Sequence, residues 1–154
     1  MADHEQLWGE LSALLRGLRS LNGHVLARAG VRCEVAGAAV LGQLELLGPV
    51  RLTELAQALG LDPSSVSRQV SAVERAGWVT RADDPTDRRA QRLRLTAAGS
   101  EVVAAITRER ATVLERLTPD WSGHDLDELT GLLARLNADI ATHREQLDVR
   151  LETA

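Results

Sequence analysis

The chain has 154 residues, of which 44% are hydrophobic and 26% are charged, a balance typical of a globular protein and not of a disordered one. Its apolar runs are only a few residues long, which excludes a membrane-spanning helix, and the acidic start Met1–Glu5 lacks a signal-peptide pattern. A single cysteine, Cys33, excludes an internal disulfide and any Cys-Cys metal pair. We therefore expect a cytoplasmic protein with no bound cofactor or metal and no membrane partner.

The net charge of −4 is unevenly distributed, and all 18 basic residues are Arg. Residues 51–96 contain eight Arg and six acidic residues, whereas the rest of the chain contains ten Arg and sixteen acidic residues. Because attraction to phosphate depends on the local potential, this layout suits a basic binding module in the middle of an acidic frame.

Two apolar stripes with alternating spacings of three and four residues lie near the two ends of the sequence. Such heptad spacing predicts long helices that pack against other helices. The two helices can pack against each other or against a second copy of the chain, and their length favours a dimer. The stripes consist of Leu7, Leu11, Leu14, Leu18, Leu21 and Val25, and of Leu126, Leu129, Leu133, Leu136, Ile140 and Leu147, with His143 in the second seam.

Shorter elements are predicted between these helices. A helix ends at Gly48-Pro49, Thr53 caps a short helix that Gly60 ends, and Asp62-Pro63 opens a helix that runs to about Ala76. Two strand-like runs follow, at residues 78–81 and 91–95, with a turn at 83–89 between them. Thr96 then caps a helix that ends near residue 117, and the last helix begins near Ser122.

Two short helices joined by a tight turn and followed by a hairpin form a winged helix-turn-helix pattern. The second helix has one apolar face and an opposite face of small hydroxyls and arginines, which suits entry into a major groove. Arg68 there can reach both hydrogen-bond acceptors of a guanine. The alternative is an ordinary amphipathic helix with a solvated serine face. The apolar face is Val66, Val70 and Val73, and the polar face is Ser64, Arg68, Ser71 and Arg75, flanked by Ser65 and Ser67.

The hairpin turn, Asp84 to Arg89, places Arg88 and Arg89 together at its tip. Paired arginines at a tip can enter a narrow minor groove, where the negative potential of DNA is concentrated. Asp87 can brace one guanidinium group in an extended pose. Taken alone, the segment is also consistent with a routine solvated loop.

The Asp-Pro-x-Asp-Arg-Arg turn (84–89), followed by Leu-Thr-x-x-Gly (95–99), resembles the MarR family of bacterial transcription regulators. The resemblance implies a mainly helical chain with a small β hairpin, organised as one domain over residues 1–154. It places a winged helix-turn-helix DNA-binding lobe at 34–97, between dimerisation helices at 1–30 and 100–154. It also implies a homodimer that binds a pseudo-palindromic double-stranded DNA operator.

Residue by residue, the resemblance places base-contacting positions at Ser64, Ser65 and Arg68, with Ser67 and Gln69 beside them, and a phosphate contact at Thr53. Arg88 and Arg89 match the wing-tip positions, of which one enters the minor groove, and Asp87 matches the carboxylate that orients it.

Many relatives are repressors that release DNA when a small molecule binds. The molecule weakens DNA binding when it binds more tightly to a conformation that does not fit DNA. We expect such an effector here. His24 and Arg28 are candidate contacts for it, or ordinary surface residues.

Four other functions can be set against this one. A thiol-based redox regulator would use Cys33, beside Arg32, although a buried inert thiol fits the residue as well. A metal-dependent regulator is disfavoured because the four histidines show no ligand spacing. An enzyme or an RNA-binding protein is disfavoured because the chain has no nucleophile or phosphate-loop motif and no cluster of aromatic residues. The histidines are His4, His24, His124 and His143, and the tryptophans are Trp8, Trp78 and Trp121.

Overall fold

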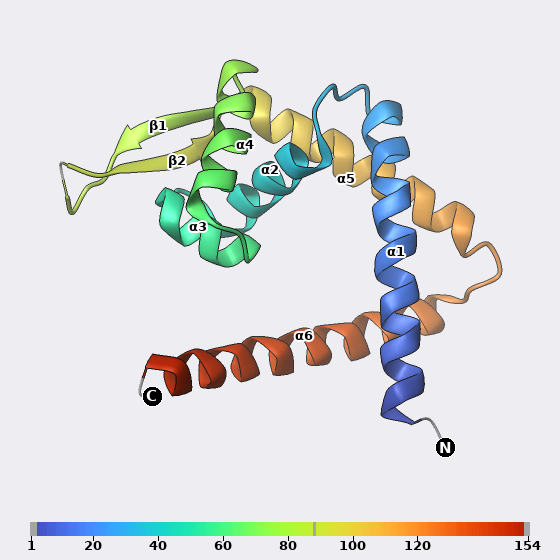
Figure 1. The fold of residues 1–154 in the computed structure, drawn as a ribbon. Helices are drawn as coiled ribbons and strands as arrows, with labels where there is room; N and C mark the ends of the chain where they lie inside the picture. The colour runs from blue at the N-terminus through green and yellow to red at the C-terminus, as the bar shows by residue number, and fades with distance from the viewer. Residues whose placement is uncertain (1–2, 88, 153–154) are drawn as a thin grey trace. The chain divides into compact units, whose positions relative to one another are not determined.

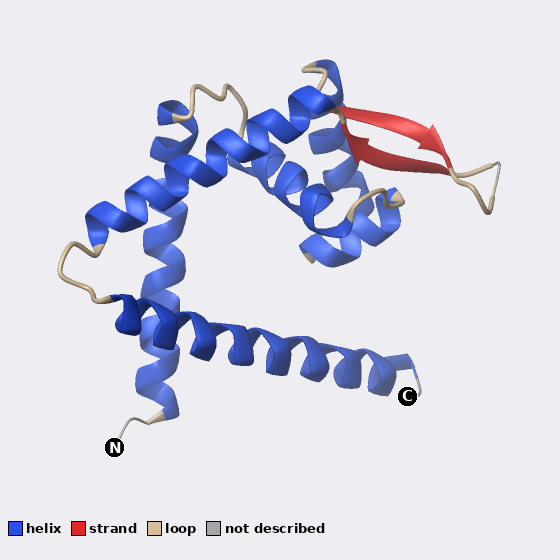
Figure 2. Cartoon of the chain, turned by 180° about the vertical axis from the view of Figure 1, so that it is seen from behind, coloured by secondary structure: helices blue, strands red, loops and turns tan. Residues whose placement is uncertain are grey.

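The computed structural model describes residues 3–87 and 89–152, with side chains as far as His143. Over these residues the chain is mainly helical with one antiparallel two-stranded hairpin (Figures 1 and 2), as the sequence predicts. It divides into two compact units, Met1–Val113 and Leu114–Ala154, which are described separately. The elements are α1 (His4–Arg28), α2 (Val35–Leu47), α3 (Leu52–Leu59), α4 (Pro63–Arg75), β1 (Val79–Asp83), β2 (Gln91–Leu95), α5 (Ala97–Leu117) and α6 (Gly123–Glu152).

The main core of the first unit joins α2, α3, α4 and the hairpin. The valines of α4 are buried in it, which confirms the predicted apolar face of this helix. Val50, between α2 and α3, pairs with β2 through two backbone hydrogen bonds to Leu93, of 2.8 and 3.1 Å between nitrogen and oxygen. The hairpin is therefore anchored to the helical core on two sides. The largest buried side chains are Val40, Leu41, Leu44, Leu55, Val66, Val70, Val73 and Leu93.

A second, smaller core joins the end of α1, the start of α2 and α5. It consists of Val25, Leu26, Val31, Ala38 and Ile106. Arg28 on α1 forms an ion pair with Glu109 on α5 at its edge. The indole of Trp78 packs against both cores.

One predicted helix start is wrong and another is confirmed. The structure starts α3 at Leu52 and places Arg51, not Thr53, at the N-cap. The carboxylate of Glu54 accepts a hydrogen bond from the Arg51 backbone N–H (2.8 Å), which holds Arg51 at the position before the first turn. The predicted start near Ser122 is confirmed, because its hydroxyl accepts from the backbone N–H of Asp125 (3.2 Å).

The Thr-x-x-Gly motif closes the hairpin onto α5. The hydroxyl of Thr96 donates to the carbonyl of Gly77 (2.7 Å) and accepts from the backbone N–H of Gly99 (3.0 Å), which confirms Thr96 as the cap. The backbone N–H of Thr96 donates to the carbonyl of Trp78 (3.0 Å). A Cβ atom on Gly99 would lie 2.0 Å from that carbonyl oxygen. Only glycine therefore lets the start of α5 approach the Gly77-Trp78 turn this closely.

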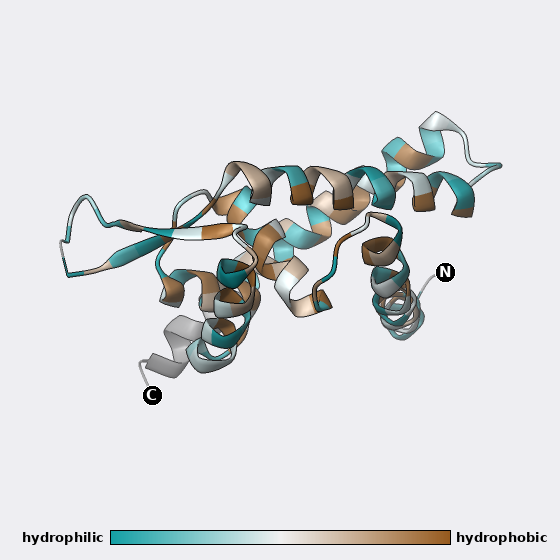
Figure 3. Ribbon diagram, turned by 90° about the horizontal axis from the view of Figure 1, so that it is seen from above, coloured by the Kyte–Doolittle hydropathy of each residue, from teal (hydrophilic) through white to brown (hydrophobic). Residues whose placement is uncertain are grey.

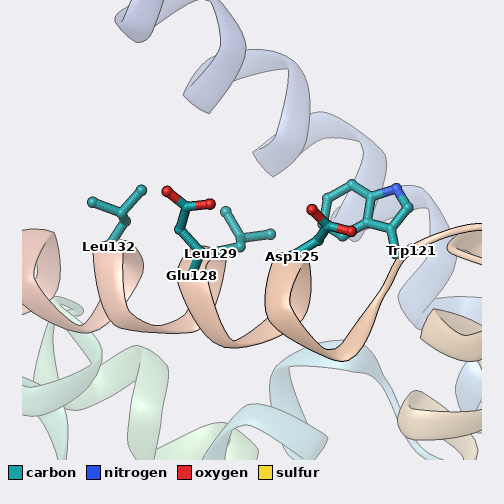
Figure 4. A pocket seen from close by; sticks show the side chains of 5 residues that line it. All are labelled: Trp121, Asp125, Glu128, Leu129 and Leu132. Atoms are coloured by element: carbon teal, nitrogen blue, oxygen red, sulfur yellow. The ribbon is translucent and has the colours of Figure 1, made fainter.

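Apolar side chains remain exposed on both units. In the first unit, Leu14 and Leu18 of α1 are 46% and 42% exposed. In the second unit, no side chain from Gly123 to His143 of α6 is buried. Trp121, Leu129 and Leu132 there line a shallow hollow together with two carboxylates (Figure 4). No helix among the described residues is long and apolar enough to cross a membrane.

We predict that Gly99→Ala lowers the free energy of unfolding by roughly 2–4 kcal/mol, because the new methyl group forces the Trp78 carbonyl away from α5. Urea denaturation measures this change. Gly42→Ala is the matched control: a Cβ there meets nothing within 4 Å, so the better helix former should raise stability by about 0.5–1 kcal/mol. Equal effects of the two substitutions would contradict the close-approach argument.

Candidate nucleic-acid interface

Asp62 caps the N-terminus of α4, as the sequence predicts. One carboxylate oxygen accepts hydrogen bonds from the backbone N–H of Ser65 (2.9 Å) and from the hydroxyl of Ser64 (2.5 Å). These bonds stabilise the charged form and hold the pKa of Asp62 well below its usual range. Pro63 occupies the first helical position, where no backbone donor is needed. The first turn of α4, including Ser64, is therefore rigidly held.

The polar face of α4 is open, and the structure brings three of the predicted base-contacting residues together on it. Ser64 and Arg68 are exposed and Ser65 is half-buried, with a guanidinium nitrogen of Arg68 3.3 Å from the Ser65 hydroxyl. Ser67 is half-buried and lines a shallow depression with Arg68 and Ser71. Gln69, also half-buried, lines a second cleft next to Cys33, to which Arg68 contributes as well.

The hairpin lies beside α4, and its strands extend away from the helices of this unit (Figure 1). Its outer end is hydrophilic (Figure 3). Two hydrogen bonds join Arg81 of β1 to the carboxylate of Glu74 on α4, at 2.8 and 3.1 Å between nitrogen and oxygen. The ion pair fixes the first strand against the end of α4.

A buried carboxylate lies at the root of the hairpin turn. Both oxygens of Asp84 accept two hydrogen bonds each: one oxygen from the backbone N–H and hydroxyl of Thr86, the other from Nε of Arg51 and Nε of Arg92. The two guanidinium groups and Thr86 hold the pKa of Asp84 far below its usual range. From the sequence alone, Asp84 has no predicted role beyond the turn. An aspartate followed by Pro-Thr is the local signal, but its arginine partners lie 33 residues before it and eight after it.

At the hairpin tip, the described residues include Asp87 and Arg89, both exposed, whereas Arg88 lies outside them. One carboxylate oxygen of Asp87 accepts from the backbone N–H of Arg89 (3.0 Å), and the other lies 3.9 Å from a guanidinium nitrogen of Arg51. Asp87 thus shapes the turn. Its predicted role in orienting a tip arginine stays a prediction. Thr53 is exposed in the first turn of α3.

The remaining candidate residues, Cys33, Arg28 and His24, each contact neighbouring residues of the fold. Cys33 is half-buried, and burial raises the pKa of its thiol, with a smaller contribution from the charge of Glu34; both disfavour the reactive thiolate. Arg28 is engaged by Glu109, and a ring nitrogen of His24 lies 3.3 Å from the Ser20 carbonyl oxygen. In the part of the chain that the structure describes, no three His, Cys, Asp or Glu side chains are grouped to hold a metal.

Comparison with known proteins decides the family. Residues 38–90, from α2 into the hairpin turn, match the MarR family. An uncharacterised helix-turn-helix transcriptional regulator of Bacillus subtilis (strain 168), YxaD, is 34% identical over 98 residues, which cover 64% of this chain and 68% of that protein. The chain belongs to the MarR family of transcription regulators. It is accordingly a helix-turn-helix transcriptional regulator and not an enzyme, and its family implies DNA binding.

Solved structures agree on the MarR fold. A crystal structure of MarR superposes with a TM-score of 0.79 at 24% identity, covering 95% of this chain and 99% of that one. A MarR family protein from Bacillus stearothermophilus gives a TM-score of 0.75 at 22% identity, covering 91% and 99% of the two chains. The matches extend over nearly the whole chain, so the terminal helices belong to the shared fold.

We predict that Asp62→Ala lowers the urea midpoint of unfolding at pH 7 by less than Gly99→Ala does, because it removes one helix cap. The pKa of Asp62 is lower in the folded state. Its stabilisation is therefore present above the unfolded-state pKa of about 3.9 and is lost as the pH falls toward the folded-state pKa. The difference between wild type and Asp62→Ala should narrow at pH 3. Asp62→Asn, which caps without a charge, should stay close to wild type at pH 7. A gap of the same size at both pH values would contradict this role.

Proposed function

We propose that this MarR-family protein is a homodimeric repressor that binds a pseudo-palindromic operator. In this proposal α4 enters the major groove and the tip of the hairpin enters the adjacent minor groove. The observation that carries it is the open serine and arginine face of α4, with the arginine-tipped hairpin beside it. As a regulator of chromosomal genes, the protein would act in the cytoplasm.

The base contacts would come from the first two turns of α4. Arg68 has the length and the planar donor pair to read both acceptors of a guanine. Ser64 and Ser65 are short, so the backbone of α4 can approach the base edges closely. Ser67 and Gln69 would border this contact. Thr53, exposed at the start of α3, would bind a backbone phosphate.

The hairpin would supply the minor-groove contact. Arg89 is exposed at the tip, next to Arg88 in the sequence, and either side chain carries the positive charge that a narrow minor groove attracts. Asp87 would orient the arginine that enters.

A homodimer is supported by the apolar surface that each unit leaves exposed. A large apolar face on a soluble regulator marks an interaction site. Exposed leucines of α1 and of α6 are members of the two heptad stripes. Such stripes are typical of helices that associate. A twofold dimer would also present two copies of α4 to a symmetric DNA site.

A small-molecule effector that relieves repression is supported by a cleft of about 380 Å³ in the first unit. It is lined by the segment Arg32–Glu34 and by the side of α4 that carries Gln69 and Arg75. A molecule held there would touch the proposed recognition helix. If the molecule binds more tightly to one position of α4 than to another, it shifts the protein toward that position. The DNA affinity would then change by as much as the molecule's affinities for the two positions differ.

Selection from a pool of randomised 30-base-pair duplexes tests the proposed function. The wild-type protein should enrich duplexes with two related half-sites, whose centres lie about one helical turn apart or a multiple of it. We predict that Arg68→Ala weakens binding to the selected duplex by roughly 1–3 kcal/mol more than binding to a random-sequence duplex, because a base contact is lost.

Arg110→Ala is the matched control for this measurement, since it removes the same charge from an exposed position on α5. It should change the two affinities little and to the same extent. Equal losses on both duplexes for Arg68→Ala would show that Arg68 binds phosphate and not a base.

We predict that the double substitution Leu14→Gln, Leu18→Gln produces folded monomers, because both side chains are exposed within the single chain and belong to the proposed dimer interface. Sedimentation equilibrium measures the mass, and circular dichroism checks the helical content. Arg16→Gln, between them on the same helix, is the control. A dimer of unchanged stability would place the interface elsewhere.

A further inference from the structure

We propose that Asp84 is a positioning residue for DNA binding: it fixes the base of the hairpin turn, at the outer ends of the strands, to the start of α3 and so sets where the tip of the hairpin lies relative to α4. The inference rests on the proposed function and extends it to a residue that contacts no DNA. It follows from the geometry of one buried carboxylate and the segments that it joins.

The Asp84 side chain has no exposed surface, and its four hydrogen bonds come from three segments of the chain. Arg51, at 2.8 Å, is the N-cap residue of α3, and Arg92, at 2.9 Å, lies on β2. Thr86 donates from its backbone N–H at 2.8 Å and from its hydroxyl at 2.7 Å. Thr86 lies immediately before the tip, so these two bonds set the direction in which the chain enters it.

The surrounding contacts converge on the same short connection between α2 and α3. A second nitrogen of Arg92 donates to the carbonyl of Pro49 (3.0 Å), and Val50 pairs with Leu93 of β2. Arg51 also reaches toward Asp87, at 3.9 Å. The base of the hairpin turn is therefore fixed to the residues that lead into α3, and α3 packs on α4. Removing the carboxylate leaves two facing guanidinium groups with no common partner.

This arrangement makes a prediction that loss of stability alone does not make. Asp84→Asn makes the chain more positive by one charge and removes the carboxylate that Arg51 and Arg92 share. Binding that depends only on phosphate attraction should stay the same or become tighter. Binding that depends on a correctly placed hairpin should weaken. A substitution that merely unfolded part of the protein would weaken both kinds of binding by the same factor.

The experiment measures the affinity of wild type and Asp84→Asn for the selected duplex and for a random-sequence duplex of equal length. We expect Asp84→Asn to weaken binding to the selected duplex roughly tenfold, about 1.4 kcal/mol, with no loss on the random duplex. Asp83→Asn is the matched control: the neighbouring side chain is exposed and the charge change is identical. It should leave the ratio of the two affinities at the wild-type value.

A double-substitution cycle with Arg89→Ala tests whether Asp84 acts through the hairpin tip. In the Arg89→Ala background, Asp84→Asn should cost little further affinity for the selected duplex. Arg68 lies on α4 and not on the hairpin, so the losses of affinity from Arg68→Ala and from Asp84→Asn should add. If Asp84→Asn fails to fold, Thr86→Val removes only the hydroxyl donor to the carboxylate and should give a smaller loss in the same direction.

Two results overturn the inference: an unchanged affinity ratio in Asp84→Asn, or losses that add with those of Arg89→Ala. If wild-type protein enriches no duplex from the pool, the proposed function fails and the inference falls with it. If wild type selects a duplex and Asp84→Asn binds it equally well, only the inference fails.

Discussion

The structure depends on the burial of one side of α4. Val66, Val70 and Val73 are almost completely enclosed by α2, α3 and the hairpin. Because α4 cannot rotate about its axis without exposing these valines, the direction of its opposite face is fixed. The serines and Arg68 are presented to solvent as a consequence of this packing. The Asp62 cap then fixes the first turn, where the proposed base contacts lie.

Backbone hydrogen bonds and ion pairs add to apolar packing in holding the hairpin, whose Val79 and Leu93 are buried in the main core. The hairpin has two strands, and an isolated two-stranded hairpin is only marginally stable in water. Three connections compensate: the Val50–Leu93 pair, the Arg81–Glu74 ion pair and the enclosed carboxylate of Asp84. The ion pair attaches β1 to α4, and the other two connections attach the hairpin to the residues that lead into α3, which packs on α4.

Local sequence rules predicted the parts of the fold that depend on neighbours in the chain. The caps at Asp62 and Thr96, the apolar faces and the two strands follow from spacing and from turn chemistry, and all are present. The N-cap of α3 was predicted at Thr53, two residues too late, because the carboxylate of Glu54 holds the backbone N–H of Arg51 at that position. The role of Asp84 was missed because its arginine partners, Arg51 and Arg92, come next to it only once the hairpin has folded against α3. No periodicity in the sequence records a pairing of this kind.

Trp78 has a consequence beyond its place in the turn before β1. Its ring touches the core of the winged lobe and also the core formed by α1 and α5. Protein interiors are close-packed, so this one half-buried ring ties the packing of the two cores together. A smaller side chain at this position would remove apolar contacts from both cores at once.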